Sequence, residues 1–97
     1  DDIRESPALD VIGLLKAKGA EVTYHDPYIP SLVTHEDEHM DSVTDLMAAV
    51  KMADCVVIIT NHSDYDYPAI VEAASLVFDS RNALGNQGKD NPKVVRL

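Results

Sequence analysis

Two arginines, Arg4 and Arg81, stand beside predicted element ends in a chain that is otherwise acidic. Arg4 precedes Ser6-Pro7, a serine N-cap followed by a proline at the first helical position, which predicts the start of a helix. Arg81 directly follows a predicted strand at 76–79. Because a helix N-terminus and a guanidinium both attract anions, either position could bind a phosphate group. From spacing alone, a surface ion pair between Arg4 and a neighbouring carboxylate is an equally good interpretation.

A second motif, His35-Glu36-Asp37-Glu38-His39, has the H-E-x-x-H spacing of zinc hydrolases. On a helix this spacing puts two imidazole ligands on one face with a glutamate base beside them. Here the segment follows a proline-containing loop, has no apolar face to bury a metal, and comes with no identifiable third ligand. The sequence therefore favours a solvated acidic loop. A zinc hydrolase that uses His35, Glu36 and His39 is a remote alternative.

The other candidate residues have weaker support. Cys55, the single cysteine, opens an apolar run at 55–59, where no charge lowers the pKa of a thiol, so we expect it to pack in the core. His62 could act as a base or orient a substrate, but the sequence fixes no partner for it, and a surface-loop histidine is the favoured interpretation. None of the four glycines forms a G-x-G-x-x-G or P-loop string. We assign no catalytic residue and no metal ligand to the chain.

Composition limits the kinds of partner. The 97 residues include 17 acidic and 8 basic side chains, for a net charge of −9, which repels nucleic acid and anionic membranes. Anion binding must therefore depend on a few well-placed arginines. The sequence has no apolar run of membrane-spanning length and no visible signal peptide. A single cysteine excludes an internal disulfide and suits a reducing cytoplasm, where we expect the protein to be.

The elements that position these residues alternate between helix and strand. We expect helices at 7–18, 45–52 and 67–74, and strands at 20–24, 55–59, 76–79 and 93–97, with a proline-containing turn at 25–30 and an acidic loop from there to about residue 41. Gly19 should end the first helix. Ser42 or Thr44 should cap the second helix, and Asp66 the third. This alternation predicts one α/β domain with a mainly parallel sheet. Because such folds usually begin with a strand, we expect a fragment that lacks its first strand.

An ordered set of segments in this chain resembles one known domain. The segments are Asp2-Ile3-Arg4-Glu5-Ser6-Pro7-Ala8, the strand and turn from Gly19 to Pro27, Ala53-Asp54, Thr60-Asn61-His62 and Phe78-Asp79-Ser80-Arg81-Asn82. Together they resemble the C-terminal, nucleotide-sugar-binding domain of the UDP-glucose/GDP-mannose dehydrogenase family, over essentially all 97 residues. The segments at 24–28 and 60–67 are most similar to the branch that oxidises UDP-N-acetylhexosamines, such as UDP-linked glucosamine or mannosamine derivatives, at C6.

The resemblance implies a three-layer Rossmann-like α/β domain, spanning 1–97, in an NAD-dependent UDP-sugar 6-dehydrogenase. In such enzymes an N-terminal Rossmann domain binds NAD, a central helical segment carries a catalytic cysteine, and the C-terminal domain closes over the nucleotide sugar. The C6 alcohol is oxidised to a carboxylate in two NAD-dependent steps. By the same resemblance, Arg81 binds the UDP portion of the substrate and Arg4 reaches the NAD. Bacterial surface polysaccharide synthesis is the implied pathway.

The resemblance also implies what this chain does not do alone. These residues do not include the family's catalytic cysteine, because Cys55 does not match its glycine-rich surroundings. They also do not include the family's aromatic-lysine pair, which stands upstream of the first loop. We therefore expect the fragment itself to be inactive. We expect it to work with the other domains of the full-length enzyme and to self-associate into a homo-oligomer. The competing hypothesis is a non-catalytic packing or interaction module.

Overall fold

The computed structural model describes residues 7–96, apart from the side chain of Gln87. The chain divides into two compact units, Asp1–Thr44 and Asp45–Leu97. Each unit has its own cluster of buried apolar side chains. Within residues 7–96, none of the helices combines the length and apolar character that crossing a bilayer requires.

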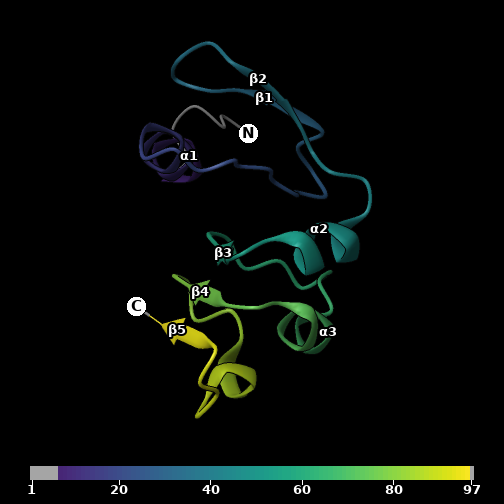
Figure 1. The fold of residues 1–97 in the computed structure, drawn as a ribbon. Coiled ribbons are helices and arrows are strands. Elements are labelled where there is room, and N and C mark those ends of the chain that lie inside the picture. Colours follow the sequence, from purple (N-terminus) through teal and green to yellow (C-terminus); the bar gives the residue numbers. More distant parts are fainter. Residues whose placement is uncertain (1–6, 97) are drawn as a thin grey trace. The chain divides into compact units, whose positions relative to one another are not determined.

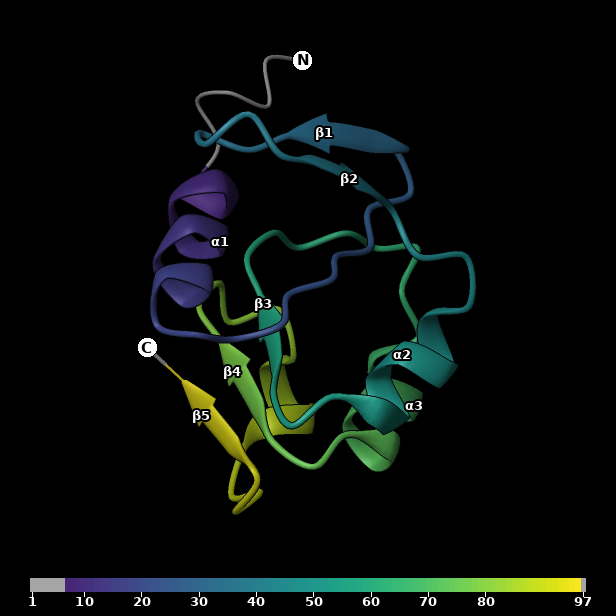
Figure 2. The same cartoon turned by 45° about the horizontal axis from the view of Figure 1, so that its top comes forward.

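The first unit packs one helix against a β-hairpin (Figure 2). Helix α1 spans Pro7–Ala17, and strands β1 (Ser31–Val33) and β2 (His39–Asp41) pair antiparallel. Leu9 and Ile12 of α1 are buried together with Leu32 of β1, which makes a small apolar cluster. Tyr24, at the edge of this cluster, donates a hydrogen bond to the Ile29 carbonyl at 2.8 Å. Burial raises the pKa of the Tyr24 phenol, with smaller contributions from nearby carboxylates, so it stays protonated at neutral pH.

Helix α1 ends as the sequence predicts, at Gly19. Gly19 adopts a φ of +93°, which a side chain would disfavour. Its N–H donates to the Lys16 carbonyl at 3.0 Å, and the Ala20 N–H donates to the Leu15 carbonyl, also at 3.0 Å. These two bonds form a Schellman motif, which satisfies carbonyls that the helix end leaves without partners. The expected N-cap, Ser6, lies outside the described residues.

The structure corrects two expectations, the strand at 20–24 and the acidic loop at about 31–41. Only Tyr24 of the first segment forms a bridge, an isolated parallel one to Ser42. The supposed loop contains β1 and β2 instead. The buried Thr34 closes the hairpin, because its N–H donates to the Glu38 carbonyl at 2.8 Å and its hydroxyl accepts the Glu38 N–H at 3.1 Å. Three-residue strands are too short to produce a readable alternation in a charged sequence.

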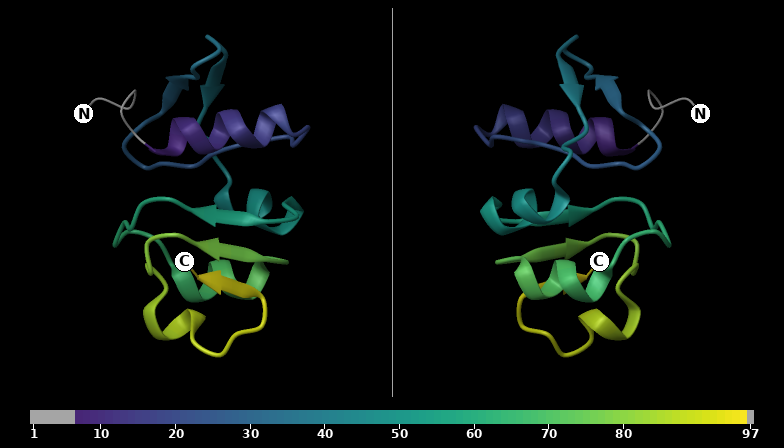
Figure 3. Two further views of the ribbon diagram at one scale, coloured as in Figure 1. Left: turned by 90° about the vertical axis from the view of Figure 1, so that its left-hand side faces the viewer. Right: turned by 90° about the vertical axis from the view of Figure 1, so that its right-hand side faces the viewer.

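The second unit contains the parallel sheet that the sequence predicts. Strands β3 (Val56–Ile58), β4 (Val77–Asp79) and β5 (Val94–Arg96) pair in the order β3-β4-β5. The three arrows point the same way in Figure 3, and both ladders are parallel. Ile58, Asp79 and Arg96 are aligned on the last rung, so they mark the carboxyl edge of the sheet.

Two short helices and a 3-10 turn complete the unit (Figure 1). Helix α2 spans Leu46–Met52, α3 spans Tyr67–Ala73, and the 3-10 turn η2 spans Gly85–Gly88. Asp66 caps α3 as predicted, accepting the Ala69 N–H at 3.2 Å. The cap of α2 is Asp45, which accepts the Ala48 N–H at 3.1 Å, so the predicted cap at Ser42 or Thr44 is wrong. Lys93, just before β5, donates to the carbonyls of Glu72 and Ala74 and so satisfies the carboxyl end of α3.

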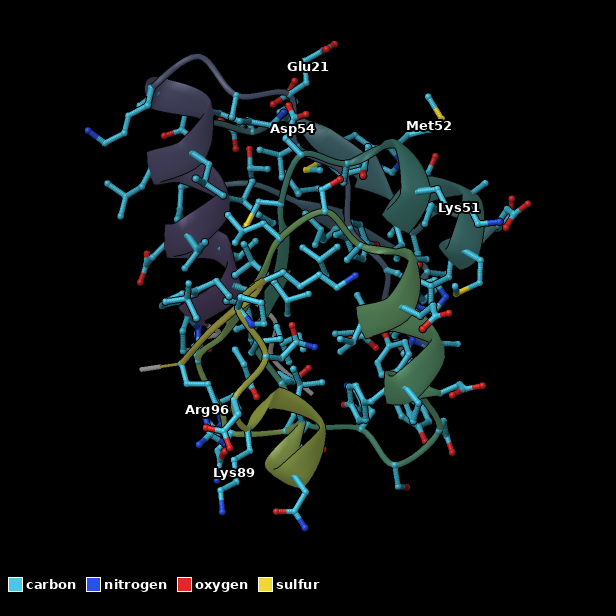
Figure 4. The ribbon with its side chains drawn as sticks, turned by 60° about the horizontal axis from the view of Figure 1, so that its bottom comes forward. Glu21, Lys51, Met52, Asp54, Lys89 and Arg96 are labelled. Carbon is cyan, nitrogen blue, oxygen red and sulfur yellow. The ribbon has the colours of Figure 1, made fainter. Side chains whose placement is uncertain are left out.

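The core of the second unit lies between the sheet and its helices. Its buried members are Val50, Ile58, Ile70, Val71, Ala74, Val77 and Leu84. Cys55 is not among them: it is exposed, and the prediction that it packs in the core is wrong. The strand begins one residue later, at Val56, and the turn that leads into it is solvated. Lys51, Met52 and Asp54 point outward at this end of the unit (Figure 4), and Met52 is 86% exposed.

Candidate functional site

The carboxyl edge of the β3-β4-β5 sheet is the candidate site. Because the three strands run parallel, the segments that follow them emerge at one edge. Residues 59–64 follow β3 and residues 80–84 follow β4. This edge is where open α/β sheets place their ligands. The structure therefore brings the loop of Arg81 and the loop of His62 to the same side of the second unit.

Asp79, the last residue of β4, is the anchor of the Arg81 loop. Its side chain is fully buried, at 0% exposure. One carboxylate oxygen accepts the backbone N–H groups of Arg81 at 3.1 Å and Ala83 at 3.0 Å, and the other accepts that of Leu84 at 3.0 Å. Three backbone donors thus converge on this one buried side chain. Asp79 thus folds the loop back over the end of its own strand.

Ser80 ties the same loop to the neighbouring strand. Its hydroxyl donates to the Ile58 carbonyl at 2.6 Å, and its N–H donates to the same oxygen at 3.1 Å. Arg81 is therefore fixed at its backbone from both sides, while its side chain is exposed. Among residues 7–96, nothing forms a hydrogen bond or ion pair with the Arg81 guanidinium. Its forked donors are thus available to a phosphate or ribose oxygen.

Sequence reasoning singled out Arg81 but missed the residues that hold it. In the sequence, Asp79 and Ser80 stand out only as part of the segment at 78–82 that resembles the family, and no pattern indicates a role for Arg96. A signal for Asp79 was present: an aspartate that ends a buried strand commonly binds the N–H groups of the following turn. Which N–H groups it would bind depends on how the loop curls, and this was not readable from the sequence.

The loop after β3 is held by a tyrosine hydroxyl. Tyr67, the first residue of α3, accepts the His62 N–H at 3.1 Å and lies 3.0 Å from the His62 carbonyl, to which its hydroxyl donates. The His62 ring is half-buried, with its centroid 5.9 Å from that of Tyr65. His62 is therefore part of an aromatic cluster rather than a solvated loop histidine.

Arg4, the other predicted anion-binding residue, lies outside the described residues. Its predicted contact with a cofactor stays a prediction. The same holds for its alternative as half of a surface ion pair.

The H-E-x-x-H segment lacks the helix that a zinc hydrolase needs. Residues 35–38 form the turn of the hairpin, and His39 begins β2. His35 contacts Asp10 at 3.1 Å and His39 contacts Asp41 at 2.8 Å, so each imidazole has a separate carboxylate partner. In the described part of the chain, no three His, Cys, Asp or Glu side chains gather as metal ligands would. The two imidazoles cannot share one helical face, which removes the basis of the zinc-hydrolase alternative.

Comparison with known proteins identifies what the chain resembles. A family model for the UDP-binding domain of the UDP-glucose/GDP-mannose dehydrogenase family matches residues 1–86. UDP-glucose 6-dehydrogenase TuaD of Bacillus subtilis (strain 168) is 32% identical over 88 residues, which cover 84% of this chain and 19% of that protein. UDP-glucose 6-dehydrogenase of Rhizobium meliloti (strain 1021) is 34% identical over 87 residues, covering 84% of this chain and 20% of that protein. The chain thus spans about a fifth of the length of these relatives. No solved structure gives a significant match.

Proposed function

Because the chain belongs to the UDP-glucose/GDP-mannose dehydrogenase family and matches its UDP-binding domain, we propose that the carboxyl edge of the β3-β4-β5 sheet binds the UDP portion of a nucleotide sugar. The observation that carries this proposal is Arg81. Its backbone is fixed by Asp79 and Ser80, and its exposed guanidinium has no partner among residues 7–96. In a chain with a net charge of −9, an exposed cation on a loop with a fixed backbone, with no carboxylate partner among residues 7–96, is suited to an anionic ligand.

The proposed role of the chain is substrate binding within an NAD-dependent UDP-sugar 6-dehydrogenase. That enzyme would oxidise the C6 alcohol of UDP-glucose or of a UDP-N-acetylhexosamine to the carboxylate. Arg81 would hold UDP, and Arg4 would contact NAD. The remaining NAD contacts must come from another domain, since none of the four glycines in this chain forms a dinucleotide fingerprint. A cytoplasmic location, a role in polysaccharide synthesis and homo-oligomerisation stay predictions.

The location of the site is testable by nuclear magnetic resonance on the 97-residue chain. Titration with UDP up to about 10 mM should shift amide signals of the loops at 60–64 and 80–84, because a site that holds only part of the substrate binds weakly. Amide signals of the hairpin turn at 35–38 should stay unchanged and serve as the internal control. Shifts confined to the hairpin, or no shift at the sheet edge, would contradict the proposed site.

The chain alone should not oxidise a UDP-sugar. We expect no NADH formation from UDP-glucose or UDP-N-acetylglucosamine with the purified 97-residue chain, because it has no dinucleotide fingerprint and its single cysteine, Cys55, does not match the glycine-rich surroundings of the family's catalytic cysteine. Absorbance at the NADH wavelength measures this directly. A complete dehydrogenase of the same family serves as the positive control, and turnover by the chain above the no-enzyme rate would refute the prediction.

A further inference from the structure

We infer that Arg96 is a positioning residue for the UDP site, which holds Asn82 and thereby keeps the Arg81 loop in its binding conformation. The inference rests on the proposed function of this edge. Arg96 lies beyond residues 1–86, the part of the chain that the family model matches. It ends β5, on the same rung of the sheet as Asp79.

The contact between Arg96 and the loop is direct. One terminal nitrogen of Arg96, Nη1, donates to the Asn82 side-chain oxygen at 2.8 Å and to the Gly85 carbonyl at 3.2 Å. Asn82 and Gly85 are the two ends of residues 82–85, which lead from the Arg81 loop into η2. Arg96 therefore joins the end of β5 to both ends of this segment. Figure 4 shows its side chain at this corner of the second unit.

Asn82 is the residue of the loop that most needs an external restraint. Its φ of 54° lies in the left-handed region, which costs energy for any residue with a side chain, although asparagine tolerates it better than most. Asp79 binds the N–H groups of Arg81, Ala83 and Leu84, on both sides of Asn82. The bond from Arg96 restrains the intervening side chain, so carboxylate and guanidinium together hold consecutive parts of one turn.

The aliphatic stem of the Arg96 side chain lies close to Gly88. Gly88, at the end of η2, is buried, and a methyl group in place of its hydrogen would lie 3.5 Å from Cδ of Arg96 and 3.0 Å from a methyl carbon of Val94. The aliphatic stem of Arg96 therefore runs close over Gly88. A guanidinium whose stem is packed in this way loses less conformational freedom when it binds its acceptors.

The inference is testable with a double-mutant cycle in the complete dehydrogenase that contains this chain. Arg96→Met keeps an apolar stem over Gly88 but removes the donors. Asn82→Gly removes the acceptor and is comfortable at a positive φ. We expect Arg96→Met to raise the KM for UDP-glucose about fivefold, with kcat changed less than about twofold. In an enzyme that already carries Asn82→Gly, the same Arg96→Met change should raise KM by less than about twofold further.

A matched control separates positioning from general electrostatics. Lys89 follows η2 and is likewise an exposed cation of this corner (Figure 4), so Lys89→Met removes one charge without touching Asn82. Its KM should change less than about twofold. The inference is overturned if Arg96→Met leaves KM unchanged, or if it raises KM equally in the wild-type enzyme and in the Asn82→Gly variant. It is also overturned if Lys89→Met raises KM as much as Arg96→Met does. An unchanged KM in Arg81→Ala, measured in parallel, instead overturns the proposed function itself.

Discussion

Replacing Arg81 by alanine should raise the KM of the complete dehydrogenase for its UDP-sugar about 30-fold, because a charge-assisted hydrogen bond to an anionic ligand contributes about 2 kcal/mol. The backbone of this residue is held by Asp79 and Ser80, so the loop should keep its conformation when the side chain is removed. The expected effect is thus on binding, with kcat changed by less than about threefold. Steady-state kinetics with saturating NAD measures both constants.

Two comparisons sharpen this experiment. If Arg81 contacts UDP rather than the sugar, the KM for UDP-glucose and the KM for UDP-N-acetylglucosamine should rise by the same factor. Lys51→Ala is the control, because Lys51 is an exposed cation at the end of α2, in a different element from the candidate loops. It should leave KM unchanged. An Arg81→Ala enzyme with normal KM and an intact fold would favour the packing or interaction module instead.

Replacing Asp79 by alanine should lower the free energy of unfolding by roughly 3 kcal/mol, because the buried Leu84 N–H would be left without a partner, at about 1 to 3 kcal/mol, and the half-buried N–H groups of Arg81 and Ala83 would lose theirs. The fully buried carboxylate accepts three backbone N–H groups, and alanine offers no acceptor in its place. Asparagine should also destabilise, since its amide nitrogen would face N–H donors. Urea denaturation followed by circular dichroism measures the loss.

Asp66→Ala provides the matched control for this substitution. Asp66 is also an aspartate that binds a backbone N–H, but it is exposed and caps the first turn of α3. Its loss should lower the free energy of unfolding by about 1 kcal/mol, the usual contribution of an N-cap. If Asp79→Ala were no more destabilising than Asp66→Ala, the role of Asp79 as the anchor of the loop would be wrong.

Much of the second unit was predictable because its signals are local. Asp66 before Tyr67-Pro68 predicts a capped helix whatever surrounds it, and the run at 55–59 predicts a buried parallel strand. Gly19 ended α1 as expected for the same reason. Cys55 lies outside the core because β3 begins only at Val56, and the start of a strand depends on where the preceding turn ends, which residue type does not determine.

The hairpin and the supports of Arg81 were not predictable because they depend on distant partners. β1 and β2 are stable through the packing of Leu32 with Leu9 and Ile12, which lie about twenty residues earlier in the sequence. Similarly, the bond from Arg96 to Asn82 joins residues that meet only when β5 pairs with β4. A sequence indicates which residues are suited to bind a ligand. It indicates less readily which other residues hold those binding residues in place.

The position of β5 has a consequence for the order of folding. Arg96 and Lys93 both come after the loop and helix that they hold, and parallel pairing of β5 requires the chain to cross from one end of the sheet to the other. During synthesis, residues 80–84 leave the ribosome before the strand that restrains them. We therefore expect the loop to pass through an open state in the nascent chain, and the proposed UDP site to form only when this late, non-local strand has docked.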